Sequence, residues 1–198
     1  MPPLTSRRVF LLGSTGLALG ACDRPCYEQN EAQKAFLGGL QSLAKTALAS
    51  NNPLKIEAAA EQSMVLAAKV GAFSDWCGTL KTIEGSAQTA AVTVEIGPQV
   101  SLYAFNDWTL AMAGSIADLF STRSREAPPP GLSDAAIAAL KTFRLGERVK
   151  IAGRMGEIAG SGLFDLSRLF GKGEAENRLF LQSPRFVARI EALGPSKK

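Results

Sequence analysis

Three cysteines, Cys22, Cys26 and Cys77, and the pair Ser42 and Lys45 are the side chains whose types and spacing suit covalent chemistry. A lysine amine three residues after a serine can activate the serine hydroxyl, but the S-D-N and K-T-G elements that accompany such a pair are absent. The chain has no histidine, which removes the usual general base and the commonest transition-metal ligand. No two carboxylates have a spacing that is typical of general acid–base catalysis or of a metal site. We therefore expect no metal and no cofactor, and the cysteines carry the remaining chemistry.

The chemistry of Cys22 is indicated by the residues before it. An uncharged run of thirteen residues, 9–21, follows Arg7 and Arg8. This run is shorter than the roughly 20 apolar residues of a membrane-spanning helix, and its basic start and small-residue end are typical of an export signal. Residues 6–11, S-R-R-V-F-L, resemble the twin-arginine export motif. Residues 19–22, L-G-A-C, resemble the bacterial lipobox.

The lipobox resemblance implies cleavage before Cys22 and a lipid on its thiol. Two or three acyl chains such as palmitate would hold the protein firmly on a membrane, whereas one chain gives only marginal binding. Asp23 directly after Cys22 resembles the signal that keeps a lipoprotein on the inner membrane. We expect the periplasmic face of the inner membrane, with the outer membrane as the alternative.

If Cys22 carries lipid, Cys26 and Cys77 remain as an even pair in an oxidising compartment. A bridge between them would close a loop of about 52 residues and contribute on the order of 4 kcal/mol in the chain-entropy model. The alternative is two free thiols, with Cys77 simply buried.

The charge balance argues against nucleic acid as the partner. Removing residues 1–21 takes away Arg7 and Arg8 and leaves 20 basic against 18 acidic residues. Dedicated nucleic-acid binding requires a concentrated cationic surface. At 46% hydrophobic residues the chain can bury a substantial core.

The hydrophobic periodicity changes along the chain from helical to strand-like. Two helices over residues 28–50 and 54–70, separated by Asn51-Asn52-Pro53, predict a hairpin. Alternating segments predict five strands, and Ser133 is suited to cap a helix between the third and the fourth. The predicted strands cover residues 76–83, 91–96, 100–105, 149–153 and 185–192.

These elements predict an α+β fold: an N-terminal helical hairpin packed on a five-stranded antiparallel OB-like β-barrel. Two insertions, residues 108–131 and 156–183, interrupt the barrel, and the second is expected to be irregular. The expected divisions are an export signal at 1–21, the lipidated cysteine with the hairpin at 22–72, the barrel at 73–194 and a tail at 195–198.

Residues 75–193 also resemble a family of uncharacterised bacterial domains. The likeness rests on W-x-G-x-(V/L)-x-x-I at residues 76–83, an asparagine after the third strand at Asn106, G-x-x-V-x-(F/I)-x-G at 146–153, and S-P-x-F at 183–186. The resemblance implies an OB-like barrel and no particular activity.

Two groups of side chains are candidates for a binding surface. OB barrels use aromatic side chains to stack bases or sugars, and Tyr103 and Trp108 are the aromatics best placed for exposure, although aromatics in strands are more often core. Leu163, Phe164 and Phe170 form an amphipathic segment that suits a partner or membrane contact, or alternatively a plug over one mouth of the barrel.

Together these patterns predict a membrane-anchored periplasmic lipoprotein that binds or scaffolds a protein or cell-envelope partner without catalysis. One alternative is a cell-envelope hydrolase that uses carboxylates. The other is a nucleic-acid-binding OB-fold protein, which the small net charge disfavours.

Overall fold

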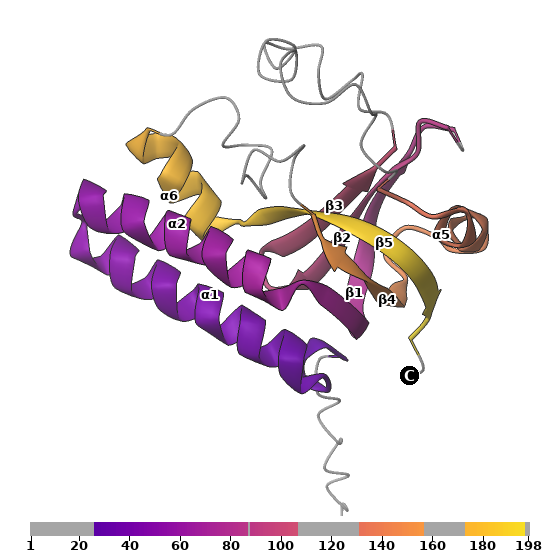
Figure 1. The fold of residues 1–198 in the computed structure, drawn as a ribbon, viewed down its shortest axis with the longest axis horizontal. Helices are drawn as coiled ribbons and strands as arrows, with labels where there is room; N and C mark the ends of the chain where they lie inside the picture. The colour runs from indigo at the N-terminus through magenta and orange to yellow at the C-terminus, as the bar shows by residue number, and fades with distance from the viewer. Residues whose placement is uncertain (1–25, 87, 107–130, 157–172, 197–198) are drawn as a thin grey trace, which may run out of the picture.

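Five strands with alternating burial close into a barrel in the computed structural model, which describes residues 26–86, 88–106, 131–156 and 173–196 (Figure 1). Val92, Val94 and Ile96 point inward and are fully buried, as their alternation predicted. The strands hydrogen-bond around the barrel in the order β1-β2-β3-β5-β4. Their bounds are β1 Ala72–Glu84, β2 Ala91–Gly97, β3 Val100–Phe105, β4 Arg148–Met155 and β5 Arg185–Pro195. The α+β class is confirmed, and the strand order fits an OB-like barrel.

The expectation of a wholly antiparallel barrel is wrong at one seam. β3 and β5 run parallel, with Leu102 opposite Phe186, while the other four pairs are antiparallel. The reason is topological, since alternating strand directions cannot close around an odd number of strands. A closed barrel of five strands therefore needs at least one parallel pair, and this barrel is mixed.

The two N-terminal helices begin and end at residues that cap them. In α1, Glu31–Ser50, the side chain of Asn30 accepts a hydrogen bond from the Gln33 amide, and Asn51 ends the helix in the left-handed region at φ 49°. Asn52 then caps α2, Pro53–Val70, with Pro53 in its first turn. The predicted break between the helices is confirmed. A short 3-10 helix, η1, Cys26–Glu28, precedes α1.

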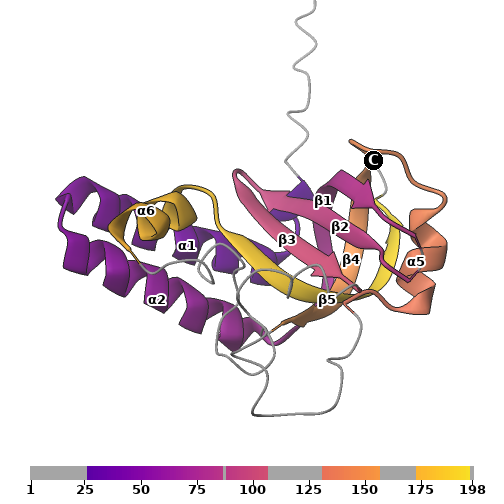
Figure 2. The same cartoon turned by 90° about the horizontal axis from the view of Figure 1, so that it is seen from above.

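A further helix, α6, Glu174–Gln182, packs against α1 and α2, so the hairpin forms part of a three-helix layer (Figures 1 and 2). The expectation that residues 156–183 are irregular throughout is wrong for this segment. Phe180 and Leu181 are buried, and Arg178 donates a 2.6 Å hydrogen bond to Asn51 in the α1–α2 link. The segment is mainly polar and has few apolar residues at helical spacing, and its sequence alone therefore gave a weak helical signal.

The helix between the third and fourth strands, α5, Asp134–Leu140, lies on the opposite side of the barrel from the three-helix layer (Figure 1). Ser133 caps it by accepting a hydrogen bond from the Ala136 amide, as expected. The Ser133 hydroxyl also donates to the Glu191 carbonyl and thereby fixes α5 to β5.

The hydrophobic core runs from the barrel into the three-helix layer. The ring centroid of Phe36 on α1 lies 5.4 Å from that of Trp76 on β1 and 5.5 Å from that of Phe186 on β5. The close approach of α1 to the β2–β3 turn depends on Gly97, because a Cβ there would meet the Leu37 side chain at 2.7 Å. The first half of α1 is consequently an integral part of the barrel domain.

Candidate functional site

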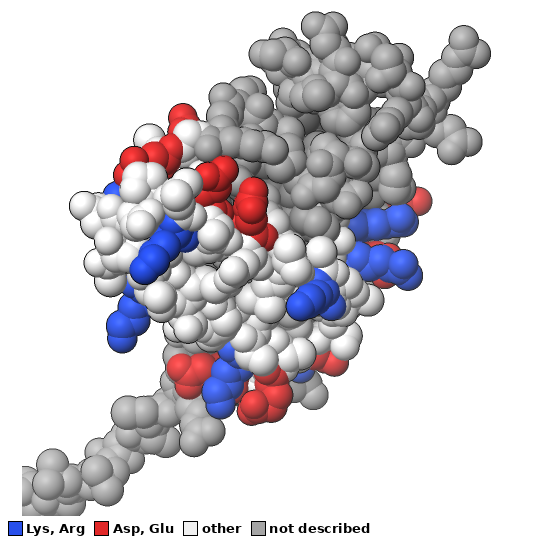
Figure 3. All heavy atoms as spheres, turned by 60° about the vertical axis from the view of Figure 1, so that its left-hand side comes forward, with Lys and Arg blue, Asp and Glu red and all other residues white. Residues whose placement is uncertain are grey.

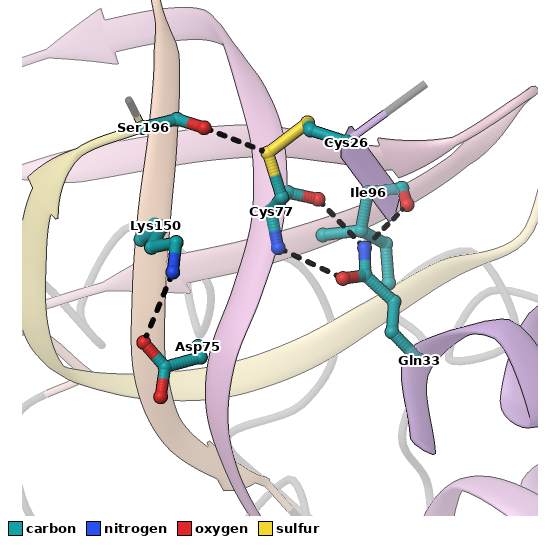
Figure 4. Close-up of a disulfide and its surroundings, with 7 residues drawn as sticks. All are labelled: Cys26, Gln33, Asp75, Cys77, Ile96, Lys150 and Ser196. Carbon is teal, nitrogen blue, oxygen red and sulfur yellow. Dashed lines mark hydrogen bonds and ion pairs between the residues drawn. A yellow bond between two sulfur atoms is a disulfide. The ribbon is translucent and has the colours of Figure 1, made fainter. Parts of the chain in front are cut away.

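Cys26 and Cys77 form a disulfide that ties the start of the described chain to the middle of β1 (Figure 4). Their Cα atoms are 5.6 Å apart across a sequence separation of 51 residues. Cys77 is buried, and its Sγ lies 3.4 Å from the hydroxyl of Ser196 near the end of β5. The chain just after Cys22 is thus covalently attached to the barrel.

Gln33 completes this junction from the first turn of α1. Its side chain is fully buried, and its amide nitrogen donates to the carbonyls of Cys77 at 2.6 Å and Ile96 at 2.7 Å (Figure 4). Its amide oxygen accepts from the Cys77 N–H at 2.8 Å. A neighbouring bond from the side chain of Asn30 to the Ser74 carbonyl, at 3.1 Å, adds to the attachment. A buried glutamine that meets three backbone groups this way satisfies polar groups that would otherwise be costly to bury.

The outer face of β1, β2 and β3 presents Tyr103. Tyr103 lies opposite Thr93 on β2, and Thr93 accepts a 3.0 Å hydrogen bond from Thr82 on β1. The ring of Tyr103 is half-buried beside that of Phe105, with centroids 5.1 Å apart. Tyr103 therefore has partial exposure on a sheet face, whereas its neighbour Phe105 is buried.

The surroundings of Tyr103 favour its neutral phenol. Burial raises the pKa of Tyr103 above its usual value, the negative charge of Glu84 raises it further, and the positive charge of Arg185 lowers it in part. Tyr103 at neutral pH is consequently a neutral phenol, which can donate a hydrogen bond, and not a phenolate.

A groove of about 280 Å³ lies between α1, the β2–β3 turn and the junction of α6 with β5. Its floor combines apolar side chains from three separate stretches of sequence: Leu40, Ala44, Leu48, Pro98, Val100, Leu181 and Pro184. Its polar lining consists of three exposed glutamines, Gln41, Gln99 and Gln182, and none of its described lining residues is charged. Sequence reasoning missed this groove. The only local signal was the apolar stripe of α1.

The other predicted site residues lie outside the described part of the chain. These are Arg7, Arg8 and Cys22 of the export and lipidation motifs, and Trp108, Leu163, Phe164 and Phe170 of the predicted binding surface. Their roles stay predictions.

Charged side chains are dispersed over the described surface. In the face shown in Figure 3, basic and acidic side chains stand singly or in small groups among uncharged residues. Within residues 26–86, 88–106, 131–156 and 173–196, no three histidine, cysteine, aspartate or glutamate side chains are grouped so as to hold a metal ion. None of the helices in these ranges has both the length and the apolar character needed to cross a bilayer.

Comparison with known proteins finds no family model, no curated protein and no solved structure that matches this chain.

Replacing Gln33 with leucine is expected to lower the free energy of unfolding by about 3 kcal/mol or more. The substitution leaves the Cys77 N–H and the Cys77 and Ile96 carbonyls without their side-chain partner in a buried junction. Urea unfolding with the disulfide intact measures the loss. The matched control is Gln62→Leu on the exposed side of α2, for which a change within about 0.5 kcal/mol is expected. Equal effects of the two variants would show that Gln33 does not hold the junction.

Replacing Tyr103 with phenylalanine tests the environment of the phenol. Because the pKa of Tyr103 is raised, the folded chain holds this proton more tightly than the unfolded chain, and stability declines as the pH rises through about 10 and beyond. The variant, which keeps Tyr27 alone, should lose less stability over that range, and it should lack part of the phenolate absorbance that wild type gains above pH 10. An identical alkaline decline in both proteins would contradict the raised pKa.

Proposed function

We propose that this chain is a lipoprotein held on the periplasmic face of the inner membrane by lipid on Cys22, with a barrel domain that binds a protein partner without catalysis. The proposal unites the lipobox resemblance at residues 19–22, the paired arginines Arg7 and Arg8, and the disulfide that begins at Cys26.

The Cys26–Cys77 disulfide is the observation that carries this proposal. Disulfides persist in oxidising compartments and are rare in the reducing cytosol. A bridge that starts four residues after Cys22 pairs the two remaining cysteines and leaves Cys22 for modification. The same bond supports export, because the chain needs an oxidising compartment to form it.

The finer description of the fold is part of the proposal. The barrel order β1-β2-β3-β5-β4, with α5 between β3 and β4, supports membership of the OB-like group that residues 75–193 resemble. The α1–α2 hairpin, extended by α6, serves as the connection between the lipid anchor and that barrel.

The uncharged groove supports a protein as the partner. The described lining residues include no lysine or arginine that could bind the negative charges of an anionic saccharide or a nucleic acid. The amides of Gln41, Gln99 and Gln182 can each donate and accept hydrogen bonds, as backbone peptide groups require, while the apolar floor accepts an aliphatic or aromatic side chain. The groove therefore suits a peptide segment that inserts one or two apolar side chains.

Lipid attachment is tested by replacing Cys22 with serine in the full-length chain. Wild type should incorporate labelled palmitate and remain with the membranes after a high-salt wash. The Cys22→Ser chain should incorporate no palmitate and should keep its export signal, residues 1–21. Cys26→Ser is the matched control and should label like wild type. Label on the Cys22→Ser chain, or a wild-type chain that retains Met1 in the cytosol, would refute the anchor.

Partner binding is tested by photo-crosslinking in intact cells. A photoreactive residue in place of Gln99, at the groove, should give a discrete protein adduct, and the same residue in place of Ala58, exposed on α2, should not. Adding Ala44→Glu, which places an unpaired carboxylate on the groove floor, should abolish the adduct, whereas Ala58→Glu should leave it unchanged. Adducts that form equally at both positions, or a carbohydrate adduct at Gln99, would contradict a protein-binding groove.

A further inference from the structure

The disulfide fixes the place on the barrel to which the chain after Cys22 is attached. Cys77 lies in the middle of β1, directly opposite Lys150 on β4. Directly opposed residues of an antiparallel pair project from the same side of a sheet. Because Trp76 next to it faces the core, Cys77 and Lys150 both project from the outer side of the barrel.

Three described residues lie beside this bond on the outer side: Asp75, Lys150 and Ser196, which with Cys26 and Cys77 we call the disulfide face (Figure 4). The ammonium of Lys150 lies 3.5 Å from the carboxylate of Asp75, and both side chains are about half exposed or more, at 48% and 71%. The hydroxyl of Ser196 lies 3.4 Å from the Cys77 sulfur. The face is thus polar and of mixed charge.

The chain between Cys22 and Cys26 limits how far this face can be from the lipid. Four residues span at most about 14 Å even when fully extended. The Cα of Cys77 is a further 5.6 Å from that of Cys26. Acyl chains on Cys22 would lie in the bilayer. The distance between the disulfide face and the headgroup layer therefore cannot exceed the sum of these two lengths.

We propose that the disulfide face is the surface of this protein that lies against the phospholipid headgroups; the proposal rests on the lipidation of Cys22. The mixed charge of the face suits this partner, since the phosphate and amine groups of phospholipids can bond to Lys150 and to Asp75 or Ser196. Without the bridge, only the packing of half-buried Tyr27 on the core and the bond of Asn30 to Ser74 hold this segment. If the Tyr27 contact yields, the free chain between Cys22 and Asn30 reaches about 28 Å, twice its bridged length. The disulfide therefore sets the orientation of the barrel on the membrane.

The opposite end of α1 is correspondingly remote from the membrane. The twenty residues of α1 span about 30 Å, and the α1–α2 link with Lys55 lies at its far end. The N-terminal end of α1 and the C-terminal end of β5 lie at the same end of the molecule (Figures 1 and 2). Lys150 and Lys55 thus report on the two ends without any substitution.

Lysine footprinting on vesicles tests this orientation. The purified lipidated protein, in vesicles of phosphatidylethanolamine and phosphatidylglycerol, is treated with a water-soluble acetylating ester, and acetylation at Lys150 and Lys55 is measured by mass spectrometry. The reference is the full-length Cys22→Ser chain without vesicles. Acetylation of Lys150 should fall by about threefold on vesicles, while that of Lys55 should stay within about 1.5-fold of the reference.

Removal of the disulfide, which lengthens the free chain between Cys22 and the barrel, provides a second measurement on the same vesicles. In a Cys26→Ser lipoprotein, acetylation of Lys150 should return toward the reference value, and Lys55 should again be unchanged. Equal protection of both lysines, or no protection of Lys150 in wild type, would overturn the orientation while the acyl mass on Cys22 still confirmed the anchor. A protein without acyl mass that does not bind the vesicles would instead refute the lipidation on which the orientation rests.

Discussion

Cys77 is the point at which the helical layer and the barrel are held together. Its sulfur is bonded to Cys26, and its N–H and carbonyl are both bonded to the side chain of Gln33. One turn further along α1, Phe36 packs on Trp76 and Phe186 and extends the same contact into the core. A covalent bond from η1, just before α1, thus acts together with three buried hydrogen bonds and an aromatic cluster from the first turns of α1, and the position of α1 follows from them.

This fixed position of α1 determines the surfaces available for binding. The stripe of Leu40, Ala44 and Leu48 continues along α1 beyond the junction and forms the apolar floor of the groove together with residues of the β2–β3 turn and of the α6–β5 junction. On the proposed account, the lipid anchor is attached at the N-terminal end of α1 and the partner binds farther along the same helix. The junction at Cys77 would then relate the membrane to the groove through one rigid element.

The sequence predicted those features that depend on local pattern. The strands could be predicted from strict alternation, as in Val92, Val94 and Ile96. The break between the helices could be predicted because Asn51-Asn52-Pro53 contains residues that end one helix and cap the next. Closure of five strands requires a parallel pair, but alternation does not say which two strands form it, and the parallel pairing of β3 with β5 was not predicted. The helix α6 and the groove were missed for a related reason, since residues near 40, 98 and 182 meet only in the folded chain. Gln33 gave no signal because its three partners are backbone groups.

The most direct measurement of this account is a non-reducing peptide map of the protein extracted from native membranes. We predict an N-terminal peptide that begins at an acylated Cys22 and is linked through Cys26 to the peptide that contains Cys77. A peptide that begins at Met1, or one in which Cys26 and Cys77 are free thiols, would contradict the account.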